Sequence, residues 1–101
     1  MEDHALILSL VHGLLGEVHP ELRAASAELD NARSVVRLRF EYDGEPSLAA
    51  RESSSCAATE VIAHFEAHWG LDEQHVVRAR PQPIAPLALL AYRRWEPEDA
   101  A

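Results

Sequence analysis

The segment 34–43, "SVVRLRFEYD", constrains the fold more than any other part of the sequence. Its apolar and polar residues alternate one by one, which is the period of a β-strand whose two faces meet different surroundings. One face carries Val36, Leu38, Phe40 and Tyr42, and the other carries Arg37, Arg39 and Glu41. A strand with one buried and one solvated face is typical of an antiparallel sheet.

The preceding segment 22–29, "LRAASAEL", alternates more weakly and predicts a second strand. Asp30 and Asn31 follow it, and both residue types favour turns. Two strands around a short polar turn predict a β-hairpin.

Two segments have helical spacing instead. Residues 4–15 place apolar side chains every three or four positions, with Ser9 and His12 on the other side, which predicts an amphipathic helix. We expect Asp3 as its N-cap and Gly16 at its end.

A second helix is expected from the N-cap Ser47 to about Trp69, with Gly70 as its stop. Its core-facing side should carry Ser54, Ala58, Val61, Ile62, Phe65 and Trp69.

Residues 75–80 and 87–95 predict two more strands, separated by the proline-rich loop 81–86. The order is therefore α-β-β-α-β-β, which predicts an α+β domain with a four-stranded antiparallel sheet and two helices packed on one face. We expect a single domain over 1–101, with residues 95–101 as a loose polar tail.

The charge balance narrows the range of partners. The chain has 17 acidic residues, nine arginines and no lysine, for a formal net charge of −8. Direct binding of nucleic acid is not expected, because phosphate contacts need clustered basic side chains. An acidic protein of this kind associates readily with basic partners.

The N-terminal apolar run is short and follows acidic rather than basic residues, so it predicts neither a signal peptide nor a membrane span. Cys56 is the single cysteine and cannot form an intramolecular disulfide. The expected location is the cytoplasm, away from the membrane.

Few residues suggest catalysis or metal binding. Cys56 has Glu52 and Glu60 nearby in sequence, which disfavour a reactive thiolate, so we expect a packing residue. His64 and His68 are four residues apart and could hold a metal with Cys56 or His75, although the H-E-x-x-H order is absent. We predict no enzyme, cofactor or metal, and keep a metal-binding module on this pair as the alternative.

Acidic residues gather around one turn. Glu41, Asp43, Glu45 and Glu52 lie on a strand end, the turn and the start of the second helix. The helix dipole accounts for Glu45 and Glu52 but not for the other two. This edge is a candidate docking surface, with Tyr42 as an aromatic anchor.

The motifs "LLGEV-P-LR", "RF-YDGE" and "RES-SC-ATE-IA-F", and the proline-flanked loop after "VVRAR", span most of the chain. With them the sequence resembles a family of small bacterial immunity proteins that are encoded beside polymorphic toxins of the Rhs and contact-dependent-inhibition type. After the "YDGE" turn, the chain has "PSLAA" where that family is often acid-rich.

This resemblance implies a non-catalytic cytoplasmic protein that binds and blocks a cognate toxin domain, one acting on nucleic acid or nucleotides, as a heterodimer. It implies contacts through Asp43, Glu45 and Glu52, to which the acidic pattern adds Glu41 and Tyr42. A homodimer of the free chain is a further alternative.

Overall fold

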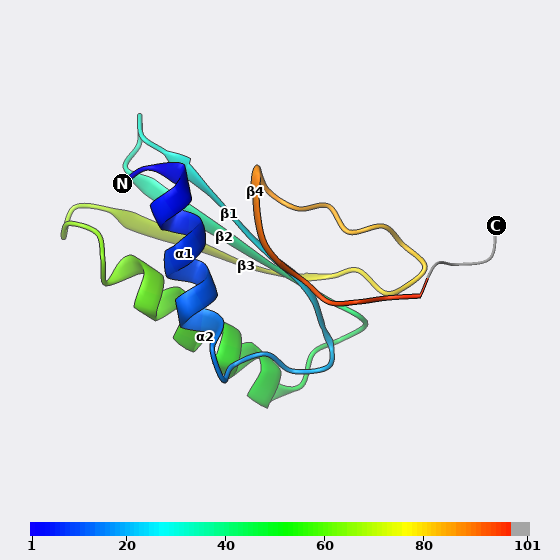
Figure 1. Ribbon diagram of the computed structural model, residues 1–101. Coiled ribbons are helices and arrows are strands. Elements are labelled where there is room, and N and C mark those ends of the chain that lie inside the picture. Colours follow the sequence, from blue (N-terminus) through cyan, green and yellow to red (C-terminus); the bar gives the residue numbers. More distant parts are fainter. Residues whose placement is uncertain (98–101) are drawn as a thin grey trace.

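The computed structural model describes residues 1–97, and Figure 1 shows its elements in the predicted order. The elements are α1 (Asp3–Leu14), β1 (Leu22–Asp30), β2 (Val35–Tyr42), α2 (Leu48–Ile62), β3 (Gly70–Val77) and β4 (Leu89–Arg93). The strands form one sheet in the order β3-β2-β1-β4, and both helices lie on the same side of it (Figure 1).

The sheet is mixed, so the prediction of a wholly antiparallel sheet was wrong. β1 pairs antiparallel with β2, which confirms the hairpin, and β1 also pairs antiparallel with β4. β2 and β3 are parallel. The reason is the connection between them, because a helix that runs back along the sheet returns the chain to the end where the first strand began.

The core lies between the sheet and the helices. Leu6 and Leu10 of α1, Val61 of α2, and Leu38 and Phe40 of β2 are fully buried in one cluster. The apolar face predicted for the 34–43 strand therefore faces the helices. α1 begins after Glu2, whose side chain makes no capping bond, so Asp3 is not the N-cap.

α2 begins as predicted, since the Ser47 hydroxyl accepts from the Ala50 N–H at 3.1 Å. It ends at Ile62, seven residues before the predicted end at Trp69. Trp69 still packs against the core, but from a turn. Gly70 is not a stop, because its N–H donates to the Ser34 carbonyl and begins β3.

β3 occupies residues 70–77, whereas the sequence predicted a strand over 75–80. The prediction missed the start of the strand because "DEQH" in its middle lacks alternating apolar residues. β3 and β4 lie at opposite edges of the sheet, so the chain between them must cross it. That crossing segment, residues 78–88, is called the strap, and it passes over the face that points away from the helices (Figure 1).

The strap covers the face that was predicted to be solvated. Its Leu87 N–H donates to the Ser26 hydroxyl at 2.9 Å, and its Ala85 carbonyl accepts from Arg39. As a result, residues 22–27 of β1 are buried on both faces of the sheet. The expectation of a solvated outer face was wrong for residues 22–27 of β1 and for Glu41 of β2, whereas Arg37 and Arg39 stay partly exposed.

Candidate functional site

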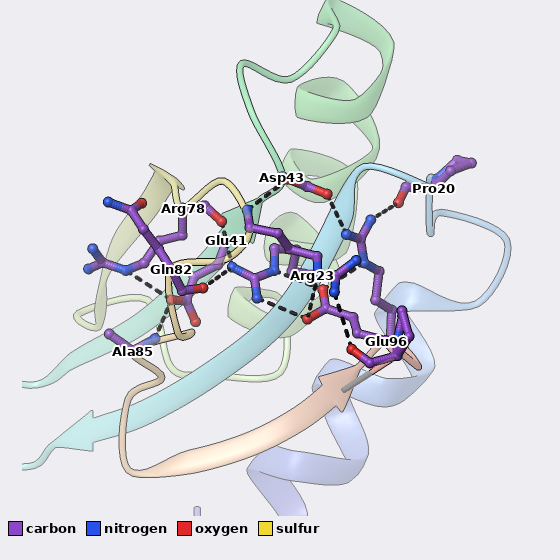
Figure 2. Close-up of polar contacts among 11 residues, drawn as sticks. Pro20, Arg23, Glu41, Asp43, Arg78, Gln82, Ala85 and Glu96 are labelled. Carbon is purple, nitrogen blue, oxygen red and sulfur yellow. Dashed lines mark hydrogen bonds and ion pairs between the residues drawn. The ribbon is translucent and has the colours of Figure 1, made fainter. Parts of the chain in front are cut away.

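Glu41 lies beneath the strap and is 0% exposed. One carboxylate oxygen accepts from the Ala85 N–H at 2.6 Å and from Arg78 Nε at 3.2 Å (Figure 2). Among the described residues the other oxygen is buried without a hydrogen-bond partner. Glu41 therefore holds the strap to β2, and it offers no surface to a partner in this conformation.

Tyr42 is also fully buried, on the opposite face, so it is not available as an aromatic anchor. Its hydroxyl lies 2.9 Å from Ser54 Oγ and 2.8 Å from His75 Nδ1. His75 Nε2 donates to Glu73 at 2.6 Å, and Ser55 Oγ donates to the same carboxylate. Burial raises the pKa of Tyr42. This chain of polar groups joins α2 to the edge strand β3.

Asp43 is half-buried and already paired. It accepts from the Arg80 N–H at 3.0 Å and from Arg94 Nη2 at 2.6 Å. These two bonds, that of the Arg80 backbone foremost, hold the pKa of Asp43 below its usual value. The Asp43 charge is therefore largely used inside the protein.

Arg23 is the centre of this polar network, a role that no sequence pattern predicted. Its Nη1 donates to the carbonyls of Arg78 and Gln82 in the strap at 2.6 and 2.7 Å (Figure 2). Its Nε and Nη2 donate to Glu96, which Arg94 also binds at 2.9 Å. The bond from Arg23 is the main cause that lowers the pKa of Glu96 to about 2.

Glu96 was predicted to lie in a loose tail, and its ion pairs contradict that expectation for this residue. Residues 98–101 of the same tail lie outside the described part of the chain. The role of Arg23 could not be predicted from the neighbouring residues in "LRAASAEL", because all of its hydrogen-bond partners are at least 55 residues away in sequence.

Glu45 and Glu52 are the two predicted contact residues that remain exposed. Glu45 is 3.9 Å from Arg51, and Glu52 borders a shallow depression on α2 together with Ser55, Cys56 and Thr59. Their role as contacts stays a prediction.

The histidine pair does not have the geometry that the sequence suggested. Because α2 ends at Ile62, His64 and His68 do not share a helical face. His64 faces α1, His68 lies 3.5 Å from Glu66, and His75 is held by Tyr42. Across residues 1–97, no three His, Cys, Asp or Glu side chains lie together so that they could hold a metal ion.

The charges divide unevenly between the two layers. Segments 1–21 and 44–69, which contain both helices, have Arg51 as their one basic side chain besides histidines. The same segments hold eight carboxylates, those of Glu2, Asp3, Glu17, Glu21, Glu45, Glu52, Glu60 and Glu66. The remaining sequence has nine carboxylates and eight arginines and is nearly neutral. Nearly all of the net charge thus belongs to the helix layer.

In the part of the chain that the structure describes, no helix has the length and apolar character needed to cross a membrane. A comparison with curated protein sequences found no match. The model of one protein family, described as "MafI2 immunity protein", matches residues 3–96. This match agrees with the motifs that resemble small immunity proteins of bacterial polymorphic toxin systems. The chain belongs to the MafI2 immunity protein family.

Proposed function

We propose that this protein neutralises a cognate toxin domain that acts on nucleic acid or nucleotides, by docking the acidic helix layer on the toxin's basic cleft. The observation that carries the proposal is the division of charge, which leaves eight carboxylates and one arginine in the helix segments. Proteins that bind nucleic acid present clustered Lys and Arg. An acidic surface is electrostatically complementary to such a cleft, and the attraction accelerates encounter.

The action is stoichiometric and non-catalytic. The protein and the toxin domain form a heterodimer in the cytoplasm of the cell that makes both, in a system of the contact-dependent type. Among the charged contact residues predicted from the sequence, we propose Glu45 and Glu52 as toxin contacts, because both are exposed. Asp43 lies at the border of this surface and contributes less, because Arg94 already binds it.

Co-expression with the toxin domain encoded beside this chain tests the function. We expect cells to survive when both are made and to die when the toxin domain is made alone. Equal lethality with and without this protein would exclude the immunity function against that toxin.

The electrostatic part has its own test. We expect the association rate of the purified proteins to fall steeply with salt concentration, and the double variant Glu45→Gln/Glu52→Gln to associate several-fold more slowly at low salt. The matched control is Glu28→Gln/Asp72→Asn, which removes two carboxylates beside Arg37 in the nearly neutral part of the chain. An equal effect from both double variants would contradict docking through the helix layer.

A further inference from the structure

Helix α1 carries apolar side chains on two sides, although its exposed side also holds His4 and His12. Leu6, Leu10 and Leu14 are buried against the core. Leu8 lies on the opposite side of the helix, and Met1 and Leu15 lie just beyond its N-terminal and C-terminal ends. The exposed fractions of Met1, Leu8 and Leu15 are 46%, 48% and 71%. We call these three residues the α1 stripe.

Shallow depressions flank the α1 stripe. One, of about 390 Å³, lies between α1 and the residues after α2 and is lined by Met1, Ala5, Leu8, Ser9, His12 and His64. The Ser9 hydroxyl on its wall is buried without a hydrogen-bond partner among the described residues. The other, of about 180 Å³, is lined by Val11, Leu14, Leu15, Val18, Ala91 and Tyr92, which join α1 to β4. The two depressions are recesses into which side chains of another protein can pack.

The α1 stripe differs from the scattered apolar residues of an ordinary surface. Single exposed leucines need no explanation, but here Met1 and Leu8 line one depression and Leu15 lines another along the same helix. Nothing in residues 1–97 covers this side of α1. A contiguous apolar surface rimmed by polar groups marks an interaction site.

The charges around the α1 stripe select the kind of partner. Segment 1–21 carries Glu2, Asp3, Glu17 and Glu21 and has no lysine or arginine. Two copies of this chain would bring these carboxylates together, and like charges across an interface are unfavourable. A partner surface with an apolar centre and basic residues around it would match the α1 stripe in hydrophobicity and the surrounding carboxylates in charge. Protein interfaces commonly have an apolar centre and a polar rim.

We infer that the α1 stripe is the apolar centre of the toxin interface, and that it contacts toxin side chains that are apolar and ringed by Lys or Arg. This inference rests on the proposed immunity function and adds to it the site and the chemistry of docking. The acidic residues accelerate encounter, and the α1 stripe supplies the contact that slows dissociation.

The test compares exposed leucines on different faces of the molecule. Leu8→Ala and Leu15→Ala, singly and together, remove apolar area from the α1 stripe, and alanine keeps a strong helix former at position 8. The control is Leu90→Ala in β4, at a residue that is 41% exposed, close to the 48% of Leu8. Leu90 is opposite Ser26, whose hydroxyl binds the strap, so it lies on the face of the sheet away from the helices. Thermal unfolding of each variant verifies that it is folded.

The probe is the toxin domain encoded beside this chain, separated from the co-expressed complex in denaturant and refolded. We expect the Leu8→Ala/Leu15→Ala variant to bind it at least about tenfold more weakly, mainly through faster dissociation, and Leu90→Ala to bind within about twofold of the wild type.

Wild-type-like binding by the double variant, or an equal loss from Leu90→Ala, would overturn the inference and leave the immunity function intact. No binding by the wild type would overturn both proposals. A homodimer in light scattering that the double variant abolishes would overturn the toxin as the occupant and replace it with a second copy of the chain.

Discussion

Arg23 and Glu96 form a bidentate ion pair, in which Arg23 Nε and Nη2 donate to the two carboxylate oxygens of Glu96 at 2.8 and 2.9 Å. The pair joins the start of β1 to the chain that follows β4, 73 residues away in sequence. The third nitrogen of Arg23 binds two strap carbonyls. One guanidinium therefore connects three segments of the chain, and its partner carboxylate controls part of the stability.

Glu96→Gln should make folding stability less dependent on pH. The pKa of Glu96 is lowered from its ordinary 4.5 to about 2 in the folded protein. A lowered folded-state pKa contributes stability that is complete above pH 4.5 and is lost as the pH falls towards 2. We expect the substitution to lower the free energy of unfolding by on the order of 2 kcal/mol at pH 7.

Urea denaturation from pH 7 down to the lowest pH at which the protein folds measures this difference. It should shrink towards zero as the pH falls through 2, because the wild-type carboxyl group then also becomes protonated in the folded protein. Glu66→Gln is the control, since the Glu66 carboxylate is exposed and its one ion pair within residues 1–97 is with His68. A wild-type-minus-variant difference that is constant with pH would contradict the role of this carboxylate.

Glu41→Ala should damage stability rather than binding. The substitution leaves the partly buried Ala85 N–H without its acceptor and Arg78 without its ion pair. We expect a loss of roughly 3 kcal/mol in the free energy of unfolding. Toxin affinity per folded molecule should stay at the wild-type value. A variant with unchanged stability and lost affinity would show that Glu41 reaches a partner after all.

Tyr42→Phe tests the polar connection between α2 and β3. Loss of the hydroxyl leaves Ser54 and His75 with unmet hydrogen-bonding groups at a buried position. We expect about 1–3 kcal/mol less stability, seen as a lower denaturant midpoint. Tyr92→Phe is the matched control, because no hydrogen bond to its hydroxyl is found within residues 1–97. Equal effects from the two substitutions would argue against a specific role for the Tyr42 network.

Gly13→Ala tests the closest approach of the two helices. A methyl group at Gly13 would lie 2.9 Å from the Ala57 carbonyl oxygen, so the helices would have to separate. Alanine normally stabilises a helix relative to glycine by roughly 0.5–1 kcal/mol. Here we expect the opposite sign, a loss of about 1–3 kcal/mol, from overpacking.

Gly70→Ala is the control for that experiment. A methyl group at Gly70 would meet Val35 at an ordinary 3.9 Å, so its thermal midpoint should change little. Stabilisation by Gly13→Ala would mean that the helices are not in close contact at this point.

The parts of the fold that depend on neighbouring residues were predictable. Alternation along 34–43 identified β2 and the side of it that faces the core, and the hairpin followed from the turn at Asp30. The Ser47 cap located the start of α2 to the residue. The end of α2 was missed because Phe65 and Trp69 pack on the core from a turn at positions that also fit a helical face.

The candidate contact residues were harder to predict, because their exposure depends on distant segments. Glu41 and Asp43 were chosen as unpaired acids, yet each binds an arginine that lies at least 37 residues further along the chain. The apolar side of α1 was overlooked because Ser9 and His12 made that side read as polar.

The sequence by itself determined the number, type and order of the elements, the family motifs and the acidic balance, because these depend on local spacing and composition. Only the tertiary structure decided which carboxylates face solvent. The crossover through α2 made β3 an edge strand parallel to β2, and the strap then had to cross the sheet to reach the opposite edge. That crossing buries Glu41 and brings arginines to Asp43 and Glu96, so that the unpaired charge is left on the helices.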